Sequence, residues 1–214
     1  MAPQVTILDY GLGNIHSIAN ALRACDALPT LSADPEAVAK ADRLILPGVG
    51  AFRDGMDGLS TRGLVQSIWV FAATGRPFLG ICLGMQMMLQ TSFEFGSHEG
   101  LGLIPGTVDA IPPTGAGGEP HKIPHIGWNR LLPVEGSEWR GSILAGVEPG
   151  ARVYFVHSFT ANPEQAQDRL ANTEYNGLSL TAALRHENLF GCQFHPEKSG
   201  KTGLTILQNF LNLR

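Results

Sequence analysis

The sequence is poor in cysteine. Its 214 residues include only Cys25, Cys82 and Cys192, and no two of them form a C-x-x-C pair. An odd number of cysteines without such a pair suggests neither a disulfide framework nor a zinc site. We expect no metal and no cofactor, and we expect at least one of the three cysteines to function as a free thiol.

Basic residues and long apolar runs are also scarce. The 15 lysines and arginines are scattered and are outnumbered by 19 acidic residues, which gives a formal net charge of −4. This balance lacks the positive surface that nucleic acids and anionic membranes attract, so neither is an expected partner. No stretch approaches the roughly 20 apolar residues of a membrane-spanning helix, and the first residues lack the cationic start of a secretion signal. These absences favour a cytoplasmic protein.

The first half of the chain alternates between strands and helices. Short apolar segments, "QVTILDY", "LPTLS", "RLILPG" and "PFLGI", separate stretches that have helical spacing. These segments are apolar without alternation, which is typical of a parallel sheet covered by helices on both faces. The pattern predicts helices over 15–22, 35–41, 63–74 and 84–92, with Asp34 as the cap of the second and Gly75 at the end of the third.

The second half changes in texture from about Gly102. Short strand-like segments broken by glycine and proline predict antiparallel or mixed pairings added to the parallel core, and a helical pattern closes the chain. The polar segment 112–122, "PPTGAGGEPHK", has too little apolar surface to pack, which predicts a mobile loop. We therefore expect one α/β domain over 1–214, with an open, mainly parallel central sheet flanked by helices.

A cysteine lies at one of the predicted turns from strand to helix. Gly80, Cys82 and Gly84 form the pattern G-x-C-x-G, the cysteine counterpart of the serine nucleophile elbow. Flanking glycines permit a sharp turn, and the start of the following helix stabilises negative charge on a thiol. The pattern predicts a nucleophile, although a buried strand cysteine would look the same in so short a motif.

A thiol nucleophile needs a base, and "QFHPEKS" contains the best candidate among the seven histidines. His195 and Glu197 are two residues apart, which places both side chains on one side of an extended segment. The carboxylate can orient the imidazole, as in a catalytic triad. A solvated surface turn is the other interpretation. His157 and His186 are alternative bases, but neither has an acidic residue two positions later.

Negative charge that develops on a substrate oxygen needs hydrogen-bond donors. The segment "LPGVGAF" places a glycine-rich turn after another predicted strand. The backbone N–H groups around Val49, Gly50 and Ala51 can complement the N–H of Leu83 beside the thiol. An ordinary turn between strand and helix is the alternative. Both turns lie at the carboxyl ends of parallel strands, where open α/β sheets bind ligands.

Taken together, "PGVGAF", "GICLGMQ", "YFVHSF" and "FHPEKS" resemble the class I, or triad, glutamine amidotransferases. The motifs occur in this order over most of the chain. The resemblance implies that Cys82 is the nucleophile, that His195 is the general acid and base, and that Glu197 orients His195. It also implies that Gly50 and Leu83 lie near the oxyanion.

The same resemblance implies a glutamine site. Gln86 and Glu94 are expected to hold the α-amino and α-carboxylate end of glutamine, together with the backbone of His157 and Ser158. On the sequence alone Glu94 is simply a polar residue after a helix. Phe159 departs from the tyrosine that is common at this place in the family, so any contact through that hydroxyl is absent.

Two further stretches, "DYGLGN" and "KIPHIGWN", resemble the glutaminase subunits of imidazole glycerol phosphate synthases, a branch of this family. That branch implies delivery of ammonia to a (β/α)₈-barrel cyclase subunit in histidine biosynthesis. Asn14, Trp128 and Lys198 are candidate contacts with it, and burial of Trp128 within its own domain is the alternative. A glutaminase of another synthase, a stand-alone γ-glutamyl hydrolase and a non-catalytic scaffold are rival interpretations of the chain.

Overall fold

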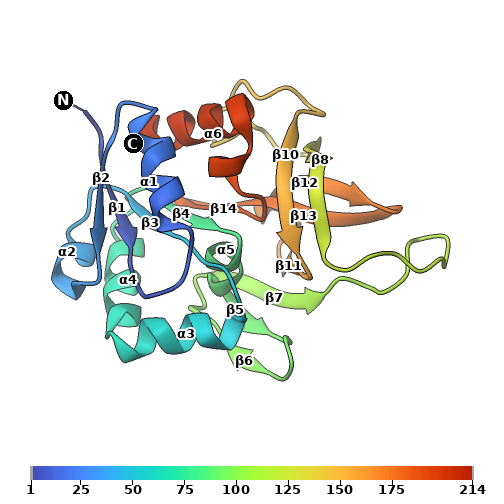
Figure 1. Ribbon diagram of the computed structural model, residues 1–214, viewed down its shortest axis with the longest axis horizontal. Coiled ribbons are helices and arrows are strands. Elements are labelled where there is room, and N and C mark those ends of the chain that lie inside the picture. Colours follow the sequence, from blue (N-terminus) through green and yellow to red (C-terminus); the bar gives the residue numbers. More distant parts are fainter. Residues whose placement is uncertain (1, 214) are drawn as a thin grey trace.

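The computed structural model describes residues 2–213 and has an eight-stranded mixed sheet at its centre (Figure 1). The strand order is β2-β1-β3-β4-β14-β13-β12-β9. Five neighbouring strands run parallel, and these are β2 (Leu28–Ser32), β1 (Gln4–Leu8), β3 (Leu44–Leu46), β4 (Phe78–Ile81) and β14 (Leu189–Cys192). The antiparallel strands β13 (Leu178–His186), β12 (Arg169–Tyr175) and β9 (Leu132–Pro133) extend the sheet at one edge.

Helices cover both faces of the parallel strands (Figure 1). One apolar core contains buried residues of α1 (Ile15–Arg23) and α6 (Gly200–Asn212), and the other contains those of α2 (Pro35–Ala39), α3 (Phe52–Thr61) and α4 (Leu64–Ala72). In β3, Ile45 belongs to the first core and its neighbours to the second, so this strand is apolar on both sides. No helix among residues 2–213 is long and apolar enough to cross a membrane.

Two smaller sheets pack beside the central one. Strands β8 (His125–Arg130) and β10 (Arg152–His157) form an antiparallel pair. The other sheet has the order β11-β7-β5-β6, with bounds Phe159–Pro163, Ile104–Ala110, Leu89–Ser92 and His98–Glu99. Two short 3₁₀ helices, η1 (Ala166–Asp168) and η2 (Pro196–Lys198), complete the fold. The predicted α/β class, with a mainly parallel centre and mixed additions, is confirmed.

The structure corrects two details of the predicted elements. The helix expected over 84–92 ends early, because α5 covers only Leu83–Met87 and the following residues form β5, which pairs with β7. Helix α3 was not predicted, since Gly55 and Gly58 weaken its helical signal. Both glycines have a packing role: a Cβ on Gly55 would lie 2.6 Å from the Met87 sulfur, and one on Gly58 would lie 3.0 Å from the Tyr10 ring.

The segment 112–122 folds back on itself and rests on the turn between β12 and β13. Gly115 N donates to the Glu119 carbonyl, and Ala116 N donates to the Asn176 carbonyl, at 2.9 and 3.0 Å. At the end of the segment the Tyr175 hydroxyl donates to the Lys122 carbonyl at 2.6 Å. The mobility of this loop stays a prediction, and these contacts tie its base to the main sheet.

Candidate active site

Cys82 occupies the sharp turn between β4 and α5. Its backbone has φ 55° and ψ −113°, a conformation that residues with a Cβ rarely adopt. Such strain costs on the order of 1–3 kcal/mol and persists only where the surroundings enforce it. The Cys82 N–H donates to the Cys192 carbonyl of β14 at 2.7 Å, which continues the strand pairing up to the turn. The thiol therefore lies at the N-terminus of α5, where the first backbone N–H groups have no partner within the helix.

The two glycines that flank the cysteine are required by close packing. A Cβ on Gly80 would lie 2.7 Å from the Met85 backbone nitrogen, and a Cβ on Gly84 would overlap the Leu46 carbonyl oxygen. The latter contact brings the end of β3 directly against the start of α5. Close packing therefore explains why glycine is required on both sides of Cys82 in the predicted elbow.

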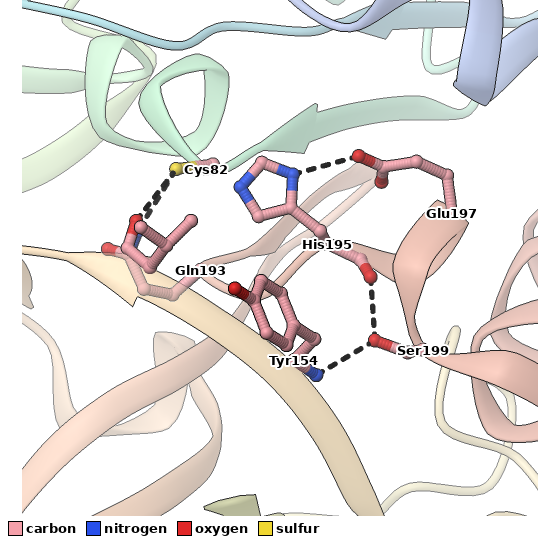
Figure 2. Close-up of polar contacts among 7 residues, drawn as sticks. Cys82, Tyr154, Gln193, His195, Glu197 and Ser199 are labelled. Atoms are coloured by element: carbon pink, nitrogen blue, oxygen red, sulfur yellow. Dashed lines mark hydrogen bonds and ion pairs between the residues drawn. The ribbon is translucent and has the colours of Figure 1, made fainter. Parts of the chain in front are cut away.

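His195 and Glu197 form a buried pair beside the thiol. The Nδ1–H of His195 donates to Glu197 Oε1 at 2.8 Å, and the two side chains are 3% and 0% exposed. Figure 2 shows the other edge of the imidazole ring facing the Cys82 sulfur. His195 Nε2 is buried and has no hydrogen-bond partner within the described chain. A solvated surface turn is therefore excluded for this segment.

The environment favours the charged form of His195. Burial by itself lowers the pKa of the imidazole, but the thiol of Cys82 and the carboxylate of Glu197 together raise that pKa to about 9. A protonated imidazole beside the thiol can donate a proton at neutral pH.

The backbone around His195 is fixed by residues that sequence reasoning missed. The Ser199 hydroxyl donates to the His195 carbonyl at 2.6 Å and accepts from the N–H of Tyr154 at 3.0 Å (Figure 2). His195 N in turn donates to the Tyr154 carbonyl at 2.9 Å. These bonds join η2 to β10, and no local sequence pattern signals them. Gln193 was also missed, and its side-chain N–H donates to the Cys82 sulfur at 3.7 Å.

A cavity of about 590 Å³ opens above the thiol. It brings together almost all of the predicted catalytic and glutamine-binding residues: Val49, Gly50, Cys82, Leu83, Gln86, Glu94, His157, Ser158 and His195. Glu197 lies behind His195. The three candidate partner contacts, Asn14, Trp128 and Lys198, do not line this cavity. The residues predicted from separate motifs therefore share one site.

The alternative bases have other partners. His157 lines the cavity, but its Nδ1–H donates to the Phe159 carbonyl at 2.8 Å. Burial, with a smaller contribution from the neighbouring histidines, lowers the pKa of His157 to about 3, against the opposing effect of that hydrogen bond. His186 pairs with Asp168 at 3.0 Å and does not line the cavity. Neither residue is placed to exchange a proton with Cys82.

The glycine-rich turn after β3 lies against the elbow. Gly50 has φ 103°, which favours glycine, and Val49 and Gly50 both line the cavity. The buried Tyr10 hydroxyl donates to the Pro47 carbonyl at 2.7 Å and anchors the start of the turn. Burial, with a smaller contribution from the charge of Cys82, raises the pKa of Tyr10 and keeps its hydroxyl protonated.

Gln86 and Glu94 each have a partner within the protein. The Gln86 side-chain N–H group donates to the Phe159 carbonyl at 3.1 Å and to Gln193 Oε1 at 2.9 Å. Glu94 Oε2 accepts from the N–H of Phe52 at 2.6 Å and so caps the start of α3. Glu94 therefore links the wall of the cavity to the start of α3, which follows the glycine-rich turn. It is not simply the solvated polar residue that its position in the sequence indicates.

The candidate partner contacts differ in exposure. Trp128 is 52% exposed and packs edge to face against Tyr154, with ring centroids 6.2 Å apart, so burial in its own domain is excluded. Lys198 is exposed in η2, and Asn14 is partly exposed just before α1. Tyr10 in "DYGLGN" is only 1% exposed, because it anchors the turn after β3, so it is no part of an exposed surface.

The chain matches the family "Glutamine amidotransferase class-I" over residues 6–213. It therefore belongs to the class I glutamine amidotransferases, and it is a glutamine-hydrolysing enzyme. More narrowly, it is similar to the imidazole glycerol phosphate synthase subunits named HisH. It is 55% identical to HisH 1 of Legionella pneumophila (strain Lens), over 98% of this chain and 99% of the relative. It is 43% identical to HisH of Sulfurimonas denitrificans, over 98% of each chain.

Solved structures share the fold at lower sequence identity. PurLQS from Thermotoga maritima matches with a TM-score of 0.71 and 21% identity, over 99% of each chain. A structure described as a glutamine amidotransferase matches with a TM-score of 0.68 and 17% identity, over 94% of each chain. The family and fold resemblance that the motifs carried is confirmed.

Proposed function

We propose that this chain is the glutaminase subunit of an imidazole glycerol phosphate synthase, with Cys82, His195 and Glu197 as its catalytic triad. The observation that carries the proposal is the arrangement of His195, which bonds Glu197 through Nδ1 and presents a free Nε2 toward the thiol at a strained turn. This is the arrangement that a nucleophile, its base and an orienting carboxylate require.

The reaction proceeds in two halves through a thioester. The Cys82 thiolate attacks the γ-carboxamide carbon of glutamine, and the Nε2 proton of His195 goes to the departing nitrogen, which leaves as ammonia. Neutral Nε2 then takes a proton from water while the water oxygen attacks the thioester. Glutamate and the thiolate are released, and His195 is protonated again. The raised pKa of His195 supports this cycle, because its resting form already carries the proton that ammonia needs.

The remaining cavity residues have complementary roles in the proposal. Backbone N–H groups at Val49, Gly50 and Leu83 stabilise the oxyanion, since they belong to the glycine-rich turn and the helix start beside the thiol. At the other end, Gln86 and Glu94 bind the α-amino and α-carboxylate groups of glutamine, together with the backbone of His157 and Ser158. Their positions along the wall of one cavity support this division.

The partner in this proposal is the (β/α)₈-barrel cyclase subunit, and the complex is a heterodimer in the cytoplasm. Ammonia is mostly protonated in neutral water and then is no nucleophile, so direct transfer preserves its reactivity. The acceptor is a phosphoribulosyl formimino carboxamide ribonucleotide, and the products are imidazole glycerol phosphate and aminoimidazole carboxamide ribotide. Similarity to HisH proteins over nearly the whole chain supports this partner.

The proposal is tested by measuring glutamate production from glutamine under three conditions: with this chain alone, with the cyclase subunit, and with that subunit and its nucleotide ligand. We expect weak activity alone and a rise of at least about tenfold in the full mixture, within the range typical of coupling between two sites. Strong activity alone, unchanged by the partner or its ligand, would instead indicate a stand-alone hydrolase or the glutaminase of another synthase.

Trp128→Ala is expected to weaken the complex without unfolding the chain. The indole is about half exposed and packs on Tyr154 of β10, whose carbonyl accepts from His195 N, so Tyr154 connects the proposed interface to the backbone of His195. Loss of a central tryptophan typically raises Kd by roughly 30-fold, or about 2 kcal/mol. Titration with the cyclase subunit measures this change.

Trp69→Ala is the matched control, because Trp69 is 44% exposed on α4, which lies well apart from β8, the strand of Trp128 (Figure 1). This variant is expected to bind the cyclase subunit as the wild type does. An unfolded Trp128→Ala protein, or one with an unchanged Kd, would contradict the interface role of Trp128.

A further inference from the structure

A chain of side-chain hydrogen bonds runs from β8 to the wall of the cavity. The Asn129 amide donates to His125 Nε2 at 3.1 Å, and His125 Nδ1 lies 2.9 Å from His157 Nε2. His157 Nδ1 then lies 2.8 Å from the Phe159 carbonyl oxygen. His125 and His157 stand directly opposite each other in the pairing of β8 with β10. The chain ends where β10 passes into β11, at residues that line the cavity.

The groups at the two ends of this series of hydrogen bonds fix which ring nitrogen of each histidine carries the proton. The Phe159 carbonyl can only accept, so His157 carries its proton on Nδ1 and accepts on Nε2. His125 must then carry its proton on Nδ1 and accept on Nε2. The Asn129 amide is oriented independently, because it also donates to the Glu174 carbonyl at 2.7 Å, while its oxygen accepts from Arg130 N at 2.8 Å. The donors therefore point in one direction, from β8 toward the cavity.

Both imidazoles are held neutral. Burial lowers the pKa of His125 to about 4, with a further contribution from His121, and burial likewise lowers that of His157 to about 3. Aromatic rings enclose His125: its centroid lies 4.9 Å from that of Phe155 and 4.3 Å from that of Tyr175. A second proton on either ring would place two donors face to face, so the order of donors and acceptors persists at neutral pH.

The Phe159 carbonyl also links the hydrogen bonds of His125 and His157 to the proposed nucleophile. It accepts from Gln86 Nε2 as well as from His157, and Gln86 donates onward to Gln193, whose own amide donates to the Cys82 sulfur. The backbone of 157–159 is therefore held from two sides. His125 supplies the donor that fixes His157 on the side remote from the thiol.

We propose that His125 is a positioning residue for glutamine, acting through His157 to hold the 157–159 backbone in its glutamine-binding conformation. The inference rests on the proposed glutamine site in this cavity. His125 itself does not line the cavity. Because a loosened backbone would weaken binding of glutamine and of the transition state equally, loss of the donor is expected to raise KM and leave kcat nearly unchanged.

Two variants at this position separate the hydrogen bond from the packing. His125→Phe keeps a ring between Phe155 and Tyr175 but has no donor, whereas His125→Asn keeps a donor close to the site of Nδ1 but loses the ring. In the complex with the cyclase subunit and its ligand, we expect His125→Phe to raise the KM for glutamine about tenfold. His125→Asn is expected to stay within about threefold of the wild type, although it melts at a lower temperature.

A purely structural role predicts the reverse order, with KM following the loss of thermal stability. That order, or an unchanged KM in His125→Phe, would overturn the inference. His121→Phe is the matched control, since His121 also packs against the Tyr175 ring, with centroids 4.8 Å apart, and does not line the cavity. The KM of this variant should be that of the wild type. A wild-type complex without Cys82-dependent glutaminase activity would instead contradict the proposed function itself.

Discussion

Cys82→Ala is expected to abolish glutamate production, lowering kcat by at least about 10⁴-fold in the activated complex. The thiol is the only group at the elbow that can form a covalent intermediate, and the free Nε2 of His195 faces it (Figure 2). Without the sulfur, water would have to attack an unactivated amide. The measurement is steady-state release of glutamate, with the cyclase subunit and its ligand present.

Cys25→Ala is the matched control for this loss. The Cys25 thiol is buried between α1 and α6, where it donates to the Leu204 carbonyl at 3.6 Å, and it does not line the cavity. Its kcat should stay within about twofold of the wild type, as for most substitutions remote from a site. Retention of activity in Cys82→Ala would mean that another group is the nucleophile.

Thiol labelling gives an independent readout. Burial raises the pKa of Cys192, with a contribution from Glu197, and burial and Asp26 raise that of Cys25. The thiolate is the reactive form, so both cysteines should react slowly. One equivalent of iodoacetamide should therefore modify Cys82 first, and loss of activity should parallel that modification.

The residues of the proposed triad could be identified from the sequence because each of them belongs to a short local motif. Gly80, Cys82 and Gly84 define the elbow within five positions, and His195 and Glu197 are separated by a single proline. The structure adds the reason for the spacing, since a Cβ at either glycine would collide with backbone. Geometry that depends on residues close together in the sequence can be recognised from a short motif.

The supporting contacts could not be predicted, because they depend on strand pairing. His125 and His157 meet only when β8 and β10 are in register, and Ser199 meets Tyr154 only when η2 packs on β10. The same reason explains why the helix prediction was wrong for Leu89–Ser92, which has a helical pattern but forms a strand paired with β7. Tertiary contacts override local propensity in each case.

Glu197→Gln is expected to lower kcat/KM by about 10²- to 10⁴-fold at pH 7, in line with the loss of an orienting carboxylate from other triads. The amide occupies the same space but carries no charge, and it can present its N–H₂ group to His195. The imidazole would then lose its fixed tautomer and one of the two groups that raise its pKa. Steady-state rates of the activated complex measure the effect.

The pH dependence of activity shows whether Glu197 favours or disfavours the proton on His195. In the wild type the pKa of His195 is raised from 6.5 to about 9, so the imidazolium is present at neutral pH and activity should fall as pH rises through about 9. In Glu197→Gln burial lowers this pKa with only Cys82 to oppose it, so the fall in activity should move to lower pH.

The raised pKa of His195 also stabilises the fold. This contribution is fully present below pH 6.5 and is lost as pH rises to about 9. The free energy of unfolding of the wild type should therefore approach that of the variant across this window.

Asp168→Asn supplies a matched control within the same chain. Asp168 accepts from His186 Nδ1 at 3.0 Å, a pair with the same chemistry as Glu197 and His195 but outside the cavity. Removing this carboxylate should leave kcat/KM within about twofold of the wild type and its upper pH limit unchanged. If Glu197→Gln behaved in the same way as Asp168→Asn, the carboxylate would be a structural partner of His195 and the triad would reduce to a dyad. If only Glu197→Gln shifts the limit, the charge of Glu197 governs the proton that ammonia carries away.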